Sequence, residues 1–314
     1  SAFRGREAVA EEKGALLDAL RPDGFALLNA DDPMVMGMAP RCRARIVTFG
    51  KDNPDADYHV ENVHAAFPDM LSFTIVGRGQ RLEVKTQFPG AQFWMPVAAA
   101  TAAALELGVP AQLIAARILT FSPVDGRCSV LPVPGGPTFI LDTTKAPDGT
   151  LDLAFDMLAQ AKIPRKRLIL GVISDYPGSG SPRYRRAWLR AREIADQVIF
   201  VAKDISHAKP TSEDVENGRI LGFATPQEAF EHVKATAQPD ELILIKGSGN
   251  LHLARIALGF VQPVQCWEPA CGMGGDCFTC PGLLVQFDGN ALKRKKKLGR
   301  LAFWKSKNEG ETAP

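Results

Sequence analysis

The residues of this chain best suited to hold a metal are four cysteines near its C-terminal end. Cys266, Cys271, Cys277 and Cys280 fall within fifteen residues, with a glycine-rich run between the second and third. Four thiolates are ligands for tetrahedral Zn²⁺ or for an iron–sulfur cluster. Because they are not spread over a small secreted domain, they do not form a disulfide framework. The spacing predicts a metal site, and four unliganded thiols are the alternative.

Polar side chains that could bind an anion or a nucleotide follow three apolar strands predicted over residues 24–28, 137–142 and 241–246. In an open α/β sheet, ligands bind outside the carboxyl ends of the strands. The side chains in question are Asn29, Asp31, Asp142, Thr144, Lys145, Lys246 and Ser248. A helix predicted over 250–258 would present backbone N–H groups to an anion beside Lys246. Plain turns and a helix-capping loop are the alternatives.

The elements that must position these residues fall into two sets separated by the segment 123–127. The first set has an amphipathic helix over 7–20, a second strand over 44–48, three alternating segments (57–64, 70–77, 81–87) and helices over 98–107 and 110–119. Two of the alternating segments are joined by a Gly-Arg-Gly turn, which predicts a hairpin.

Strands and helices alternate in the second set. We predict further strands over 167–173, 197–202 and 219–223, and helices over 148–161, 182–195 and 226–237. This rhythm predicts a mostly parallel, doubly wound sheet covered on both faces, and an α/β fold. We expect domains at residues 1–122 and 123–262, and a Cys-rich segment with a basic tail at 263–314.

The order of these motifs resembles that of the Mur ligases, which add amino acids to peptidoglycan precursors. The resemblance covers roughly residues 5–260. It rests on the Glu-Glu-Lys-Gly of 11–14, the turn at 29–33, the alanine-rich helix after 90, the Gly-Arg at 126–127 and the Lys-Gly-Ser at 246–248. It implies part of a central ATPase domain followed by a Rossmann-like C-terminal domain.

The resemblance also implies roles for individual residues. Lys13 would be carbamylated and help to hold Mg²⁺, and Lys246 would be the second catalytic residue. Asn29, Asp31, Arg127 and Asp142 would contact ATP, whose phosphates suit the permanently charged guanidinium of Arg127. Thr144, Lys145, Lys246 and Ser248 would bind the amino-acid or peptide substrate. A solvated Lys13 and a hinge arginine in a surface ion pair are the alternatives.

The chain departs from the family pattern at several positions. Phe93 and Pro96 stand where the family has asparagines, one of which contacts adenine, and we expect Phe93 and Trp94 to be core residues. Thr143 replaces a Tyr or His, and Gly249 replaces an Arg. The phosphate loop G-x-x-x-x-G-K-[ST] is absent from the sequence. We therefore expect the first half of the ATPase domain upstream in a longer chain or in a partner, or a loss of activity.

The overall composition and charge indicate which classes of partner and which cellular compartment to expect. The net charge is +2 and the apolar content 46%, so nothing in the overall charge demands nucleic acid. No apolar run reaches the ~20 residues of a membrane span, and no signal peptide precedes the first helix, so we expect a cytoplasmic protein. The basic run 293–297 predicts a solvated tail, with binding to anionic lipid or nucleic acid as the alternative.

These observations favour part of an ATP-dependent amide ligase that forms an acyl phosphate and passes the acyl group to an amine. The first alternative is a non-catalytic regulatory or assembly subunit with a structural metal. The second is a redox protein built on the cysteines.

Overall fold

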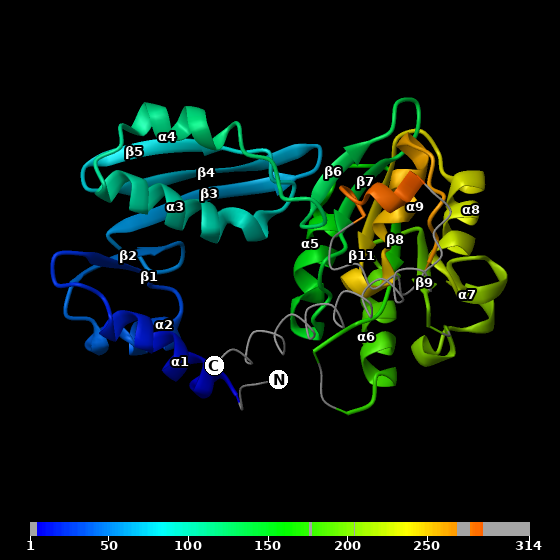
Figure 1. Cartoon of the computed structure of the whole chain (residues 1–314), viewed down its shortest axis with the longest axis horizontal. Helices are drawn as coiled ribbons and strands as arrows, with labels where there is room; N and C mark the ends of the chain where they lie inside the picture. Colours follow the sequence, from blue (N-terminus) through cyan, green and yellow to red (C-terminus); the bar gives the residue numbers. More distant parts are fainter. Residues whose placement is uncertain (1–4, 176–177, 204, 269–276, 285–314) are drawn as a thin grey trace, which may run out of the picture. The chain divides into compact units, whose positions relative to one another are not determined.

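The structure, a computed structural model, describes residues 5–175, 178–203, 205–268 and 277–284. The chain divides into two compact units (Figure 1). Unit 1 comprises residues 1–124 and 156–163, and unit 2 comprises residues 125–155 and 164–314.

Unit 1 is built on a five-stranded sheet in the order β1-β2-β3-β4-β5. Its strands are β1 (Phe25–Asn29), β2 (Arg45–Gly50), β3 (Tyr58–Ala66), β4 (Asp69–Gly77) and β5 (Gln80–Lys85). The first three are parallel, and β3, β4 and β5 pair antiparallel. The predicted hairpin is confirmed as β4 and β5.

The helices of unit 1 are α1 (Arg6–Asp18), α2 (Pro33–Gly37), α3 (Trp94–Glu106) and α4 (Ala111–Ile118). The helix α3 packs on strands β1 to β4, and α4 packs on β5. The core between them includes Val47, Leu71, Ile75, Val84 and Ala98, each less than 9% exposed. Phe93 and Trp94, predicted to be core residues, are half-buried and pack against this core without being among its buried members.

Unit 2 is built on a six-stranded sheet in the order β10-β9-β8-β11-β7-β6. The strands are β6 (Ser129–Pro132), β7 (Thr138–Asp142), β8 (Arg165–Leu170), β9 (Gln197–Val201), β10 (Ile220–Phe223) and β11 (Glu241–Lys246). Strands β7 to β11 are parallel, and β6 pairs antiparallel with β7 at the edge. The α/β fold predicted from the sequence is confirmed.

Helices cover both faces of this sheet (Figure 1). They are α5 (Leu151–Gln160), α6 (Ser181–Ala191), α7 (Ser212–Glu216), α8 (Pro226–Thr236) and α9 (Ala254–Val261). The first half of α5, up to residue 155, belongs to unit 2, and the second half belongs to unit 1. Right-handed crossovers place α5 and α6 on one face and α8 on the other. Ring contacts agree, because Phe200 meets Tyr184 of α6, whereas Phe139 meets Phe260 of α9.

Candidate functional site

A buried ion pair joins the carboxyl ends of two neighbouring parallel strands in unit 2. Lys246 ends β11 and Asp142 ends β7, and the two residues are paired in register. The Lys246 ammonium donates to Asp142 Oδ2 at 2.7 Å and to the Lys145 carbonyl at 2.7 Å. The Lys246 side chain is only 5% exposed and that of Asp142 14%. Because a buried charge must be paired, this contact fixes the turn after β7 to the end of β11.

The turn that carries Arg127 is hydrogen-bonded to the same place. The Gly126 carbonyl accepts from the Thr143 N–H at 3.0 Å, the Thr144 N–H at 3.2 Å and the Thr144 hydroxyl at 3.0 Å. Gly126 has φ of +72°, and a Cβ there would lie 2.9 and 3.0 Å from the two threonine hydroxyl oxygens. Only glycine satisfies both constraints. Exposed Arg127 is therefore held beside the turn that follows Asp142.

A third strand end and the Ser248 loop complete the arrangement. The Lys246 carbonyl accepts from the Gly171 N–H, just after β8, at 2.8 Å, and Gly249 N–H donates to the Thr144 carbonyl at 3.1 Å. Strand β11 lies between β7 and β8. The chain leaves β7 and β8 towards one face of the sheet and leaves β11 towards α9 on the other. Such a switch point is where α/β sheets bind ligands.

The helix predicted over 250–258 exists as α9, but its predicted start at residue 250 is wrong. A single 3₁₀ turn spans Gly249–Leu251, His252 adopts a left-handed conformation with φ of +53°, and α9 begins only at Ala254. The Gly249 N–H is already bonded to Thr144. The expected helix N-terminus for an anion is therefore not formed next to Ser248, and the exposed cations at this edge are Arg127 and Lys145.

The polar turn after β1 in unit 1 organises its own loop. The Asp31 carboxylate accepts backbone N–H groups of Lys51, Asp52 and Asn53 at 2.7 to 3.0 Å. Asn29 Oδ1 accepts from the Asp31 N–H at 3.1 Å. These bonds join the ends of β1 and β2. The nucleotide contacts of Asn29 and Asp31 stay predictions.

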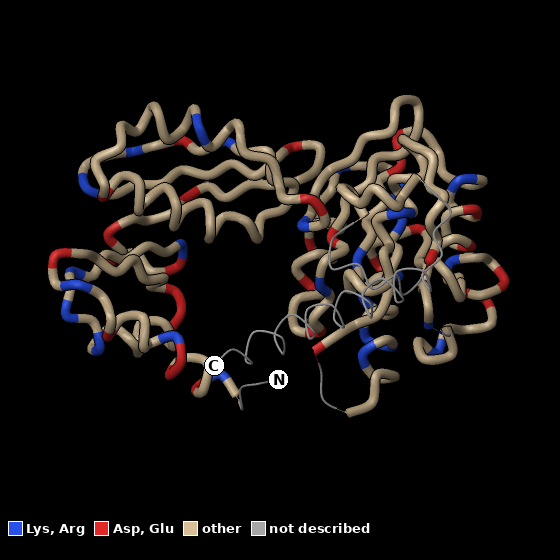
Figure 2. The backbone as a smooth tube through the Cα atoms, in the orientation of Figure 1, with Lys and Arg blue, Asp and Glu red and all other residues tan. Residues whose placement is uncertain are grey.

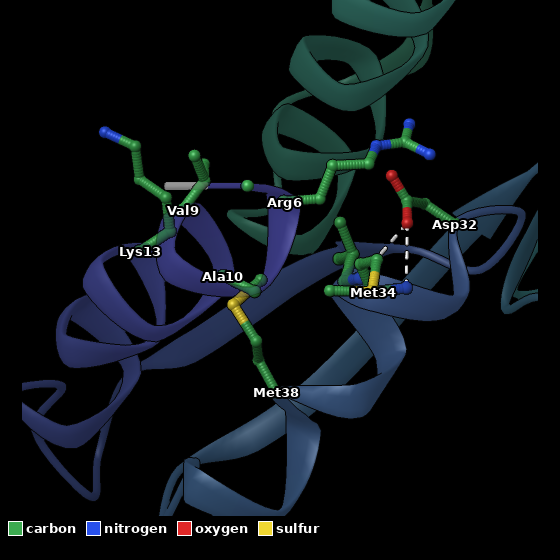
Figure 3. A pocket seen from close by; sticks show the side chains of 9 residues that line it. Arg6, Val9, Ala10, Lys13, Asp32, Met34 and Met38 are labelled. Atoms are coloured by element: carbon green, nitrogen blue, oxygen red, sulfur yellow. Dashed lines mark hydrogen bonds between the residues drawn. The ribbon is translucent and has the colours of Figure 1, made fainter. Parts of the chain in front are cut away.

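Exposed Lys13 lies on α1 and lines a pocket of about 440 Å³ between α1 and α2 (Figure 3). Most of the lining is apolar, and Arg6 and Asp32 add charge. In Figure 3 the Lys13 and Arg6 side chains extend in opposite directions from α1. In the part of the chain that the structure describes, no three His, Cys, Asp or Glu side chains are grouped to hold a metal. Carbamylation of Lys13 stays a prediction.

The Cys-rich segment is described at both of its ends. Cys266 and Cys277 are buried and Cys280 is half-buried, whereas Cys271 and the basic run 293–297 lie outside the described residues. Cys277 Sγ accepts from Arg255 Nε at 3.3 Å and lies 3.5 Å from His252 Nδ1. Burial, and then the charge of Arg255, lower the pKa of His252 below its usual value. The metal stays a prediction.

Four residues with contacts in this region were not predicted from the sequence: Gly171, His252, Arg255 and Phe278. None of them belongs to a periodic pattern, and each becomes significant only through a neighbour distant in the chain. Figure 2 shows that Lys and Arg residues and Asp and Glu residues are both spread along the backbone of each unit. No helix among the described residues has the length and apolar character to cross a membrane.

The sequence of this chain is similar to those of known proteins of one family. The model of the Mur ligase middle domain matches residues 2–104. The UDP-N-acetylmuramoyl-L-alanyl-D-glutamate–2,6-diaminopimelate ligase of Halalkalibacterium halodurans is 28% identical over 231 residues, covering 72% of this chain and 46% of the relative. The UDP-N-acetylmuramoyl-tripeptide–D-alanyl-D-alanine ligase of Mycobacterium bovis is 24% identical over 286 residues, covering 84% and 56%.

Solved structures show the same fold. The MurF ligase of Thermotoga maritima in complex with ADP matches with a TM-score of 0.67 at 17% identity, covering 82% of this chain and 57% of that one. A UDP-N-acetylmuramoylalanyl-D-glutamyl-2,6-diaminopimelate–D-alanyl-D-alanyl ligase from Acinetobacter baumannii matches with a TM-score of 0.70 at 19% identity, covering 83% and 56%. The chain spans about half the length of the curated relatives it matches.

Proposed function

Because this chain belongs to the Mur ligase family, we propose that it forms part of an ATP-dependent ligase acting on a peptidoglycan-like precursor. The ligase joins an amino acid or peptide amine to the precursor's carboxylate through an acyl phosphate. The observation that carries the proposal is the set of polar groups gathered at the switch point of unit 2. Arg127, Asp142, Lys145 and Lys246 come from distant parts of the sequence and are held there by hydrogen bonds.

These residues fit the phosphates of a nucleotide. Arg127 presents a permanent charge and a planar set of N–H donors suited to phosphate oxygens, and Lys145 adds a second exposed cation. Buried Lys246 fixes Asp142 and the Lys145 carbonyl, so it positions the turn with two of its three N–H groups. ATP would supply the phosphoryl group that activates the substrate carboxylate, and Thr144 and Ser248 would bind substrate beside it.

The described residues do not complete a Mg²⁺ site. A hard cation such as Mg²⁺ is held by oxygen ligands, and no suitable group of three His, Cys, Asp or Glu side chains exists in the described ranges. A carbamate on Lys13 would add oxygens at the pocket that Asp32 also lines. We therefore assign no step of the reaction to the metal.

The direct test is ADP binding to the whole chain, measured by calorimetry. We expect Arg127→Gln to weaken binding by roughly 10- to 100-fold, because a charged hydrogen bond contributes about 1.5–3 kcal/mol. Arg117→Gln, which removes an exposed arginine from α4 of unit 1, is the control and should bind as the unaltered chain does. Equal ADP affinity of both variants would refute the role of Arg127.

A non-catalytic relative is the second candidate. It is favoured by Phe93, which stands at an expected asparagine position and packs with its ring centroid 4.8 Å from that of Phe88. Neither Phe93 nor Pro96 can donate a hydrogen bond to adenine from its side chain. Release of phosphate from ATP by the natural full-length protein, with cell-wall peptides and amino acids present, would exclude this candidate. Nucleotide binding without any turnover would support it.

We also propose that the four cysteines hold Zn²⁺ or an iron–sulfur cluster. Their spacing supports this proposal, and Cys266 and Cys277 are buried. The three of these cysteines that the structure describes are not grouped as a metal site, so the ligands would have to come together when the metal binds. Protein purified without oxygen should contain zinc, or iron and sulfide with visible absorbance. A colourless protein without zinc would contradict both versions. The control is Cys42→Ser, which removes a thiol far from the other four in the sequence and should leave the metal content unchanged.

A further inference from the structure

The C-terminal Cys-rich segment comes close to the turn that carries Arg127. The Phe278 Cε2 atom lies 3.7 Å from the position that a Cβ on Gly126 would occupy. Phe278 also packs against the apolar cluster formed by Ala254, Leu258 and Leu283. The Phe278 ring therefore packs on α9 and also comes close to Gly126, whose carbonyl accepts three hydrogen bonds from the turn after Asp142.

A single buried guanidinium fastens this segment to α9. Arg255 is 2% exposed. Its Nε donates to Cys277 Sγ at 3.3 Å, and its Nη1 donates to the Glu268 carbonyl at 2.8 Å. His252 Nδ1 lies 3.5 Å from the same sulfur. The Arg255 side chain of α9 therefore bonds to both residue 268 and residue 277 of this segment. Residue 277 directly precedes Phe278.

The later part of the segment closes back on its beginning. The Leu283 carbonyl accepts from the N–H groups of Gln265 at 2.9 Å and Cys266 at 3.3 Å, and the Leu283 N–H donates to the Cys280 carbonyl at 3.1 Å. Leu283 itself is buried against α9. These bonds limit how far Phe278 can move from Gly126, because the backbone on both sides of the ring is anchored.

We propose that Phe278 is a positioning residue for the phosphate-binding turn of Gly126 and Arg127, and that the contact of Cys277 with Arg255 holds it in place. The inference rests on the proposed function, since its ligand is the phosphate group of a nucleotide. It gives the Cys-rich segment a role in ligand binding that neither the fold of unit 2 nor the cysteine spacing implies. Loss of the ring would let Gly126 shift within the limits of its three hydrogen bonds, and Arg127 would shift with it.

The test compares the whole chain with Phe278→Ala, Phe278→Tyr and Leu284→Ala. Leu284 belongs to the same segment but is 57% exposed, so it is the matched control. Two quantities are measured: the ADP dissociation constant, and amide hydrogen exchange of residues 124–130 and 142–146. We expect Phe278→Ala to weaken ADP binding about tenfold, which is the lower end of the effect expected when a charged hydrogen bond is lost. Exchange should become faster in those two ranges, and β11 should keep the protection of the unaltered chain.

The aromatic variant Phe278→Tyr should restore both quantities, and Leu284→Ala should change neither. Faster exchange throughout unit 2 in Phe278→Ala would show a general structural role and would overturn the proposal, as would unchanged exchange at 124–130. If the unaltered chain binds no ADP, the proposed function fails. The exchange comparison then decides by itself whether Phe278 positions the turn.

Discussion

Breaking the contact between Lys246 and Asp142 should destabilise unit 2 strongly. At 2.7 Å the attraction between the two charges is about 6 kcal/mol at an effective dielectric constant of about 20. Desolvation offsets part of this gain. Removing one partner leaves an unpaired charge in a buried site, which costs about 3–5 kcal/mol. Because the Asp142 side chain is 14% exposed, we expect Asp142→Asn to cost about 3 kcal/mol, at the lower end of that range.

The double variant separates the charge pair from ordinary packing. Lys246→Met should also cost about 3 kcal/mol, whereas the double variant leaves no charge unpaired and should lie within about 1.5 kcal/mol of the unaltered chain. Urea unfolding followed by hydrogen exchange of β7 and β11 measures each variant. A loss of 3 kcal/mol should lower the midpoint by roughly 1–2 M. Asp152→Asn, at an exposed position on α5, is the control.

Two results would contradict a buried, interacting charge pair. One is a loss below about 1 kcal/mol for Asp142→Asn, which would mean that water reaches the Lys246 ammonium. The other is a double variant whose loss equals the sum of the two single losses, since additive losses mean that the two side chains do not interact.

Three further predictions concern the two units separately. Burial and the hydrogen bond to Glu106 raise the pKa of Tyr58 to about 12, so its contribution to stability is present below pH 10 and is lost as the pH rises from about 10 to about 12. An absorbance titration compared with Tyr58→Phe checks this. Glu241→Gln leaves Arg167, which is 0% exposed, without a carboxylate and should cost about 3–5 kcal/mol in urea unfolding. Thr225→Ala removes the cap of α8 and should cost about 1 kcal/mol, seen as a lower melting temperature.

The sequence predicted most strands of unit 2 because each is an apolar run bounded by turn residues. Strand β6 was missed, since Ser129–Pro132 is short and ends in proline, and only its antiparallel pairing with β7 makes it a strand. The helix after Ser248 was placed too early. Apolar spacing cannot show that the Gly249 N–H bonds to Thr144, 105 residues earlier in the chain, or that His252 is left-handed.

Residue types at strand ends indicated where polar groups would gather, but not which groups would meet. Asp142 and Lys246 are 104 residues apart, and their contact depends on the parallel register of β7 and β11. The occupation of the Asp31 carboxylate by three backbone N–H groups depends likewise on the loop after β2. The approach of Phe278 to Gly126 brings together two segments with no shared pattern, so no local signal predicts it.

We propose that nucleotide phosphates bind at the carboxyl ends of β7 and β11, beside Arg127. Amide hydrogen exchange of the whole chain, with and without saturating ADP, tests this binding site. We expect slower exchange in residues 124–130 and 142–146 when ADP is bound. Protection confined to other segments, with these two ranges unchanged at saturation, would contradict it.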